Sequence, residues 1–305
     1  MKISTSRSDS VFVVISYIIV IVVAFLCFYP FWFMLINSFA TREAAVQGVF
    51  IFPGRGEFSF DTYMAIFRDG DVFRGMAVSV MRVLVSTVGG IVFSAMFAFL
   101  ITRQKLPFRK VIYRFAIITM YVNAGLIPWY LVMRMYGLFN NFHVYWVPHM
   151  INVFFVILIK TYIESIPPAL EDSARVDGAG FFKTFFIIIL PLSKPILATA
   201  ALFMAVHQWN SFIDNFLLVQ NPNLQTVQMI LFNYLRQTES IANAMRNAAT
   251  TGGISDIMIQ NLRNNMTVES VRNTITIIAM APIMVIYPFL QKYFAGGIML
   301  GAVKG

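Results

Sequence analysis

Long apolar runs recur along this chain, and they restrict its fold more than any other feature of the sequence. A helix that crosses the hydrocarbon core of a bilayer needs about 20 predominantly apolar residues. Six runs of roughly that length occur, over residues 11–35, 78–101, 111–132, 145–163, 195–219 and 274–294. They predict an all-α membrane protein with six transmembrane helices, organised as a single domain over residues 1–305.

The composition supports a membrane protein and does not indicate nucleic-acid binding. Hydrophobic residues make up 58% of the 305 residues and charged residues 12%, whereas soluble domains average about 45–50% apolar residues. The formal net charge of +9 is spread over segments that flank the apolar runs, without a block of five or six basic residues. Cys27 is the only cysteine, so no disulfide can form within the chain.

The distribution of lysine and arginine predicts the orientation of the helices. Basic residues lie before the first run, between the second and third, between the fourth and fifth, and after the sixth. If six helices alternate in direction, these connections share one side of the membrane, and both termini are cytoplasmic. Arg82 and Arg134 lie near the predicted outer helix ends, where long side chains can reach the interface. We therefore expect both to have a structural role.

The connection over residues 164–194 is several times longer than a helical hairpin needs. Pro168 suits a helix start, and Glu171 follows in the first turn, where a carboxylate complements the helix dipole. Gly178 suits the left-handed position that ends a helix. A second helical segment follows and is closed by Pro191. We expect two short helices around a glycine bend, projecting as a compact knob on the cytoplasmic side.

This loop resembles the EAA loop of the permease subunits of binding-protein-dependent ABC importers. That pattern reads roughly E-A-A, two residues, D-G-A, and then I-x-L-P, which begins after the nine residues that follow the glycine. The triplet here reads D-S-A, which departs at the first two places, while the other two elements match at the expected spacing. The residues concerned are Glu171, Asp172, Ser173, Ala174, Asp177, Gly178, Ala179, Ile188, Leu190 and Pro191. The resemblance implies a coupling helix between the fourth and fifth spans that docks on a cytoplasmic ATPase subunit.

Two further segments are similar to carbohydrate permeases related to the maltose system. The fifth run contains a Q-W-N sequence from Gln208 to Asn210, and the chain closes with K-Y-F and G-A-V-K-G sequences. The resemblance implies a MetI-like permease fold and a carbohydrate substrate, an oligosaccharide. In that family the tail reaches toward the ATPase pair, which implies such contacts for Gly301, Ala302, Val303, Lys304 and Gly305.

The segment over residues 220–272 is polar and rich in asparagine, and it is longer than the outer loop expected of a simple maltose-type permease. Such an insertion resembles permeases for pectic, alginate-like or other complex oligosaccharides. Its predicted position outside the membrane suits contact with an extracellular solute-binding protein. A passive surface elaboration is the alternative.

Polar residues inside the predicted spans are candidates for the translocation path, because unpaired polar groups are costly in hydrocarbon. Sugar transport requires hydrogen-bonding groups and aromatic faces. The candidates are Asn123, Asn152, His207, Gln208, Trp209 and Asn210, and Asp214 and Asn215 are further polar residues of the spans. Hydrogen bonding between helices is an equally strong interpretation. The three histidines are too dispersed for a recognisable metal motif, and we predict no metal site.

The sequence contains no G-x-x-x-x-G-K-[ST] phosphate loop, so the chain is expected to supply no ATPase chemistry. No combination of nucleophile, base and orienting residue stands out, and we predict a transport subunit rather than an enzyme. The family implies that ATP and Mg bind to partner chains and that the location is a bacterial inner or plasma membrane. The implied partners are a second permease subunit, two cytoplasmic ATPase subunits, an extracellular or periplasmic solute-binding protein, a carbohydrate and the lipid bilayer. The alternative is a secondary transporter or channel that works without ATP.

Overall fold

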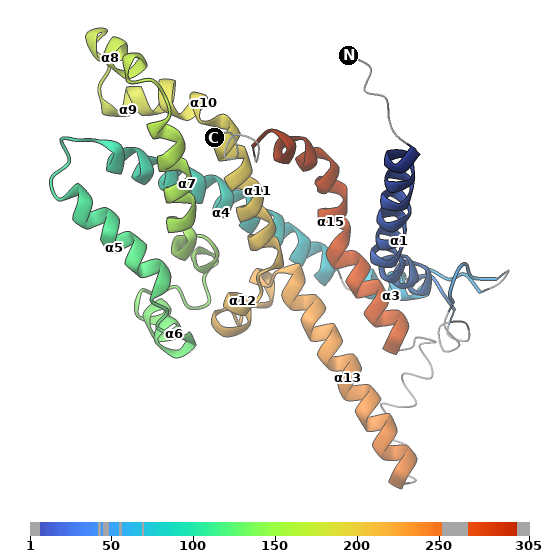
Figure 1. The fold of residues 1–305 in the computed structure, drawn as a ribbon. Helices are drawn as coiled ribbons and strands as arrows, with labels where there is room; N and C mark the ends of the chain where they lie inside the picture. Colours follow the sequence, from blue (N-terminus) through green and yellow to red (C-terminus); the bar gives the residue numbers. More distant parts are fainter. Residues whose placement is uncertain are drawn as a thin grey trace. The chain divides into compact units, whose positions relative to one another are not determined.

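The computed structural model describes residues 7–41, 44, 49–54, 57–68, 70–251 and 268–297. Over these residues the regular structure is helical, apart from one isolated bridge between Ala40 and Phe58, in agreement with the predicted all-α class (Figure 1). The chain divides into two compact units. The first comprises Met1–Asp69 with Leu231–Ala281, and the second comprises Gly70–Ile230 with Pro282–Gly305.

The first unit contains α1 (Arg7–Ser38) and α3 (Asp61–Arg68), with most of α13 (Val227–Thr251) and the first part of α15 (Val268–Gly297). Along α1 the apolar side chains from Val11 to Phe28 are largely exposed, as expected for a helix that faces lipid. Near the C-terminal end of α1, the Asn37 side chain donates a hydrogen bond to the Val49 carbonyl at 2.8 Å and accepts one from the Val49 N–H at 3.0 Å.

The second unit is built around α4 (Asp71–Thr102), α7 (Val153–Glu164) and α11 (Lys194–Asn210). Small residues on α4 let the other helices approach closely. A Cβ at Gly90 would lie 2.6 Å from Met204 Sδ of α11 and 3.0 Å from the His149 carbonyl oxygen, so a larger residue here would displace the end of the Met204 side chain and press on the backbone at His149. The buried core of the unit consists of Ile91, Ala95, Ala98, Phe99, Ile101, Phe155, Val156, Ile159, Ile163, Phe185, Ile189, Ala200 and Met204.

Three predicted spans are not continuous helices. In place of one helix over residues 145–163, two short 3-10 segments, η1 (Phe142–Tyr145) and η2 (Val147–His149), precede α7. In place of one helix over residues 111–132, α5 (Arg109–Tyr121) ends before an extended Val122, and α6 (Leu126–Met135) begins after Gly125, whose φ is +85°. In place of one helix over 195–219, α11 ends at Asn210 and α12 (Ile213–Leu218) follows. All three predictions of a single helix were wrong, because apolarity continues through these breaks although the helical backbone does not.

Three helices in the described part of the chain are long and apolar enough to cross a membrane: Val11–Ser38, Asp71–Thr102 and Glu269–Tyr287. Two bent pairs pass the same test together, Phe142–His149 with Val153–Glu164 at 45° and Phe181–Leu192 with Lys194–Asn210 at 81°, which raises the number to five. These five correspond to predicted spans, and the sixth prediction, 111–132, is the segment that divides into α5 and α6.

Candidate functional sites

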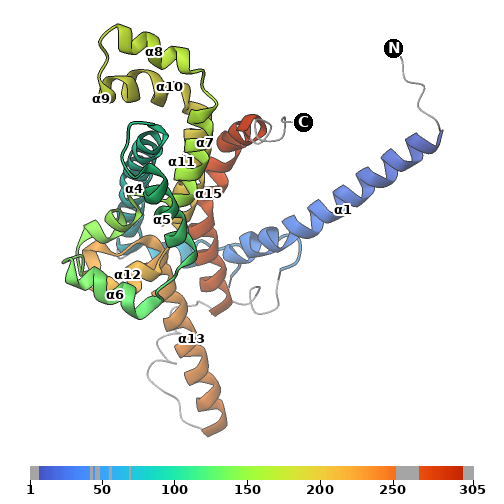
Figure 2. The same ribbon diagram turned by 60° about the vertical axis from the view of Figure 1, so that its left-hand side comes forward.

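The connection from α7 to α11 forms a knob of short helices at one end of the second unit, opposite α6 and α12 (Figure 2). Its first helix, α8 (Pro168–Val176), has Glu171 in the first turn. Gly178 has a φ of +75°, and the N–H of Ala179 donates to the Ala174 carbonyl at 2.9 Å. This bond is the one expected where a left-handed residue ends a helix. The predicted helix start and glycine stop are therefore confirmed.

The chain then returns to the helical bundle through α9 (Phe181–Thr184), a π-helical segment η3 (Phe185–Ile189) and α10 (Leu190–Leu192). The side chains of Phe185 and Ile189 are 0% and 1% exposed, within the core that they share with α4, α7 and α11. The predicted closing position, Pro191, lies inside α10, one residue before its end. The knob is thus anchored to the bundle by its returning segment.

The motif residues divide between an inward and an outward face of the knob. Ala174 is buried; Glu171, Ala179, Ile188 and Leu190 are partly buried; Asp172, Ser173, Asp177, Gly178 and Pro191 are exposed. Large apolar side chains also point outward, with Val176 exposed to 88%, Phe182 to 64% and Leu170 to 44%. An exposed surface that combines carboxylates with large apolar groups is suited to a protein contact.

An ion pair connects the knob to α4. The guanidinium of Arg103, at the C-terminal end of α4, donates to both carboxylate oxygens of Glu171, with Nη2 to Oε1 at 2.7 Å. The Arg103 and Glu171 side chains are only 21% and 16% exposed, and the guanidinium carbon lies 4.0 Å from the centroid of the Phe99 ring. From the sequence, Arg103 was only one of the basic residues that predict which side of the membrane a connection faces. Its pairing with Glu171 was not predicted, because no spacing rule relates positions so far apart in the chain.

Replacing Glu171 with alanine should weaken the connection between α8 and α4 by about 1.5–3 kcal/mol, the typical value for hydrogen bonds to charged groups. We expect a lower midpoint of thermal unfolding with little loss of membrane insertion. The matched control is Glu164→Ala, which removes a carboxylate that pairs with Lys160 one turn away on α7 and is 47% exposed. Equal unfolding midpoints for the two variants, measured in detergent, would contradict this role for Glu171.

A buried polar cluster surrounds Arg82 on α4. Its Nη1 and Nη2 atoms donate to Oδ1 and Oδ2 of Asp214 at 3.0 and 2.5 Å, and the two side chains are 1% and 4% exposed. Arg82 also donates from Nε to Gln208 Oε1 and from Nη1 to the Ser211 carbonyl, both at 3.0 Å. Its guanidinium carbon lies 4.7 Å from the centroid of the Tyr145 ring.

The expectation that Arg82 reaches the membrane interface was wrong. The interruption between α11 and α12 brings the Asp214 carboxylate back against α4, so the arginine is paired inside the protein instead. Arg134, for which the same role was expected, is exposed. It donates to Tyr130 Oη at 3.3 Å and lies over the Phe139 ring.

The polar network continues along α4 and holds the irregular backbone around α12. Asn215 Oδ1 accepts hydrogen bonds from the N–H and hydroxyl of Thr226 at 2.7 and 3.0 Å, and Ser79 Oγ accepts from the Val227 N–H at 2.9 Å. Backbone that leaves the helix inside a membrane protein needs such partners. Within the described residues, the buried Gln208 Nε2 and Asn215 Nδ2 atoms have no hydrogen-bond partner.

Three of the predicted path residues make local backbone contacts. Asn123 Oδ1 accepts from the Gly125 N–H at 2.9 Å in the break between α5 and α6. Asn152 caps α7, accepting from the N–H groups of Phe154 and Phe155. Asn210 donates to the Val206 carbonyl of its own helix at 2.9 Å. These bonds explain the three asparagines structurally, and their part in a path stays a prediction.

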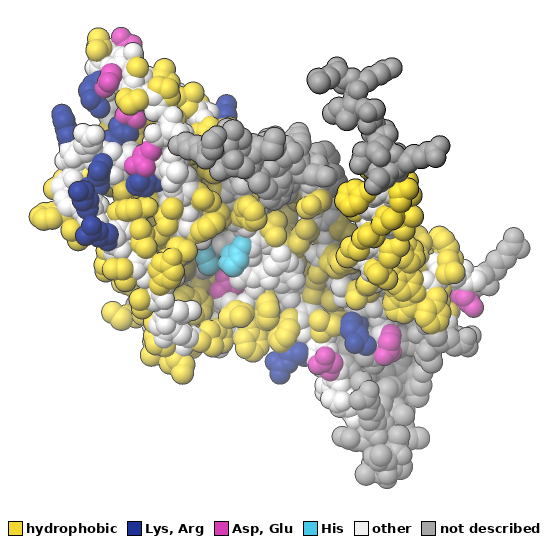
Figure 3. Space-filling model, in the orientation of Figure 1, with side chains coloured by type: hydrophobic (Ala, Val, Ile, Leu, Met, Phe, Trp, Pro, Cys, Tyr) yellow, Lys and Arg dark blue, Asp and Glu magenta, His cyan; other side chains and the backbone are white. Residues whose placement is uncertain are grey.

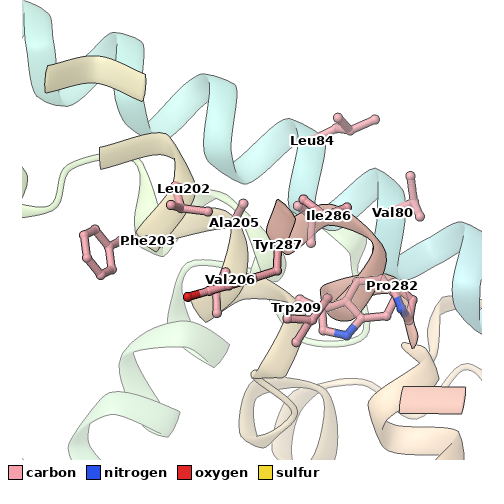
Figure 4. A pocket seen from close by; sticks show the side chains of 12 residues that line it. Val80, Leu84, Leu202, Phe203, Ala205, Val206, Trp209, Pro282, Ile286 and Tyr287 are labelled. Carbon is pink, nitrogen blue, oxygen red and sulfur yellow. The ribbon is translucent and has the colours of Figure 1, made fainter. Parts of the chain in front are cut away.

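The other predicted path residues differ in their surroundings. Gln208 belongs to the Arg82 cluster, and His207 is exposed on α11. Trp209 lines an apolar cavity of about 480 Å³ between α4, α11 and the stretch of α15 that belongs to the same unit (Figure 4). Its other lining side chains include Val80, Leu84, Phe203 and Ile286. A sugar site needs polar groups to fix orientation, so this cavity is not suited to a sugar.

The predicted ATPase-contacting tail, residues 301–305, lies outside the described residues.

Comparison with known proteins identifies the class to which this fold belongs. No family model matches the chain. It is 34% identical to Protein LplC of Bacillus subtilis (strain 168), over 90% of this chain and 89% of the relative. It is 31% identical to the polygalacturonan/rhamnogalacturonan transport system permease protein YtcP of the same organism, over 92% and 94%. The crystal structure of a bacterial ABC transporter involved in the import of the acidic polysaccharide alginate contains a similar chain, with a TM-score of 0.81, 27% identity, and coverage of 95% and 98%.

The helical fold is therefore that of an ABC importer permease, a membrane subunit that is not itself an enzyme. Within this class, the chain belongs to the family of carbohydrate ABC transporter permeases.

Proposed function

We propose that this chain forms part of an ATP-driven importer for oligosaccharides derived from acidic polysaccharides, delivered by an extracellular solute-binding protein. The observation that carries the proposal is the likeness to the alginate importer, with a TM-score of 0.81 over 95% of this chain. The relative named for polygalacturonan and rhamnogalacturonan transport supports the same substrate class. Uronic acid units are common to these polymers, so the expected substrate carries both hydroxyl and carboxylate groups.

The proposal assigns the knob to the ATPase contact, with α8 as the coupling helix. Its support is the exposed surface that combines Asp172 with Val176 and Phe182, together with the Arg103–Glu171 ion pair that leads from this surface to α4. Movement of α8 would thereby act directly on a long helix of the bundle. Two ATPase subunits would hold ATP and Mg, and a second permease subunit would complete the path.

The proposed topology has six crossings, with α5 and α6 together forming the third and both termini in the cytoplasm. Its support is the distribution of charge at the end of the second unit that carries α8. Figure 3 shows Lys and Arg side chains gathered there, above a surface that is mainly hydrophobic. The connection between α4 and α5 contributes Arg103, Lys105, Arg109 and Lys110. A cytoplasmic position for this end follows the positive-inside rule.

Reconstitution tests the function directly. The complex of this chain with its second permease, ATPase subunits and binding protein should import trigalacturonate into proteoliposomes only in the presence of ATP. Uptake of maltotriose, a neutral sugar of the same length, should be at least about tenfold less efficient, equivalent to roughly 1.4 kcal/mol. A preference for maltotriose would refute the acidic substrate class. Transport by the chain alone without ATP would instead establish a secondary transporter, a class in which broken helices also occur.

A further inference from the structure

Two histidine rings lie together on the second unit although their positions in the sequence are far apart. His149 is the last residue of η2 (Val147–His149), and His207 lies near the C-terminal end of α11. The ring centroids are 6.2 Å apart and the ring planes are inclined by 72°. His149 is partly buried and His207 is exposed. Figure 3 shows histidine side chains reaching the surface within a hydrophobic face.

Close packing against α4 positions both rings. A Cβ at Gly90 would meet Met204 Sδ at 2.6 Å and the His149 carbonyl oxygen at 3.0 Å, so η2 and α11 contact α4 at one point. Met204 precedes His207 by about one helical turn. Gln208, the residue after His207, accepts a hydrogen bond from Arg82 at 3.0 Å. The backbone that carries each imidazole is therefore held against α4, at the His149 carbonyl on η2 and through Met204 and Gln208 on α11.

The rings have hydrogen-bonding capacity that the described part of the chain does not use. Within it, no hydrogen bond to the His149 or His207 side chain is found, and the buried Nε2 atom of Gln208, the residue after His207, also has no hydrogen-bond partner. Polar groups in the hydrocarbon region are costly unless they face a partner or a water-filled cavity. Their position within a mainly hydrophobic face therefore indicates that this face meets a polar partner in the assembled transporter.

We propose that His149 and His207 form a contact site for the transported oligosaccharide within the translocation path. This inference rests on the function proposed above. A neutral imidazole offers one donor and one acceptor, which matches a sugar hydroxyl, and its N–H can also bond a carboxylate. The nearest acidic group of the buried cluster, Asp214, is neutralised by its bidentate pair with Arg82, so it does not oppose an acidic sugar.

The test uses His149→Ala, His207→Ala and the double variant in the reconstituted complex, with labelled trigalacturonate as the probe. Each single variant should raise the KM of uptake by about tenfold, and the double variant should raise it by less than the product of the two. His143→Ala is the matched control, since that exposed ring lies on η1 (Phe142–Tyr145), bonded to Asn141 and packed against Trp146. It should leave the KM unchanged.

A conservative variant separates substrate contact from a structural role. His207→Gln retains a donor and an acceptor and should recover most of the lost KM, while the thermal unfolding midpoint stays the same as in the wild type. Wild-type uptake together with unchanged KM values in the alanine variants would overturn the inference and leave the proposed function intact. Absence of carbohydrate uptake by the wild-type complex would refute the proposed function itself.

Discussion

Replacing Arg82 with alanine is expected to destabilise the folded chain by about 3–5 kcal/mol, the cost of breaking a buried ion pair by removing one partner. The Arg82 and Asp214 side chains are 1% and 4% exposed, so water cannot solvate the carboxylate that remains. The substitution also removes the donors to Gln208 and Ser211. We expect little assembled complex after purification and a strongly lowered unfolding midpoint in detergent.

Two controls distinguish the unpaired charge from simple loss of a side chain. The double variant Arg82→Met with Asp214→Leu removes both charges and should recover a large part of the stability, because no lone charge stays buried. Arg74→Ala removes an arginine from the same helix, whose pair with Asp71 is 41% and 49% exposed. It should cost at most about 1 kcal/mol. If Arg82→Ala and Arg74→Ala behave alike, the buried pair is not important for stability.

The parts of this structure that could be predicted from sequence are those governed by local patterns. Apolar runs predict the long helices α1, α4 and α15, because length and hydrophobicity decide which segments can cross a bilayer. The boundaries of α8 follow from Pro168 and Gly178, since these residues restrict or permit particular backbone angles. Both rules depend only on neighbouring residues.

The parts that could not be predicted depend on contacts between distant positions. Arg82 and Asp214 are 132 residues apart in sequence, and Arg103 and Glu171 are 68 apart. Neither pair can be recognised from the sequence, because each forms only when the helices pack. The break between α5 and α6 was also missed, although Gly125 at its end was a local signal. Hydropathy measures the polarity of side chains and is insensitive to whether the backbone remains helical.

The second large effect is expected for Gly178→Val, which should abolish coupled transport while the spans remain inserted. The φ of +75° at this position disfavours any residue with a Cβ by about 1–2 kcal/mol, and a β-branched residue by more. No atom lies within 4 Å of a Cβ built at Gly178, so the penalty comes from the backbone itself. The chain can relieve it by changing the angle between α8 and α9, which alters the surface proposed to meet the ATPase.

Transport, rather than folding, should be the more sensitive measurement for this substitution. The knob remains anchored through the buried Phe185 and Ile189, so a changed bend displaces α8 without exposing the bundle core. Gly178→Asn should retain most activity, because asparagine tolerates left-handed angles. Gly180→Val is the positional control, since Gly180 has a φ of −73° and open space around its Cβ. The measurements are co-purification with the ATPase and the rate of ATP-driven uptake. If Gly178→Val retains both at wild-type levels, this bend does not position the ATPase contact.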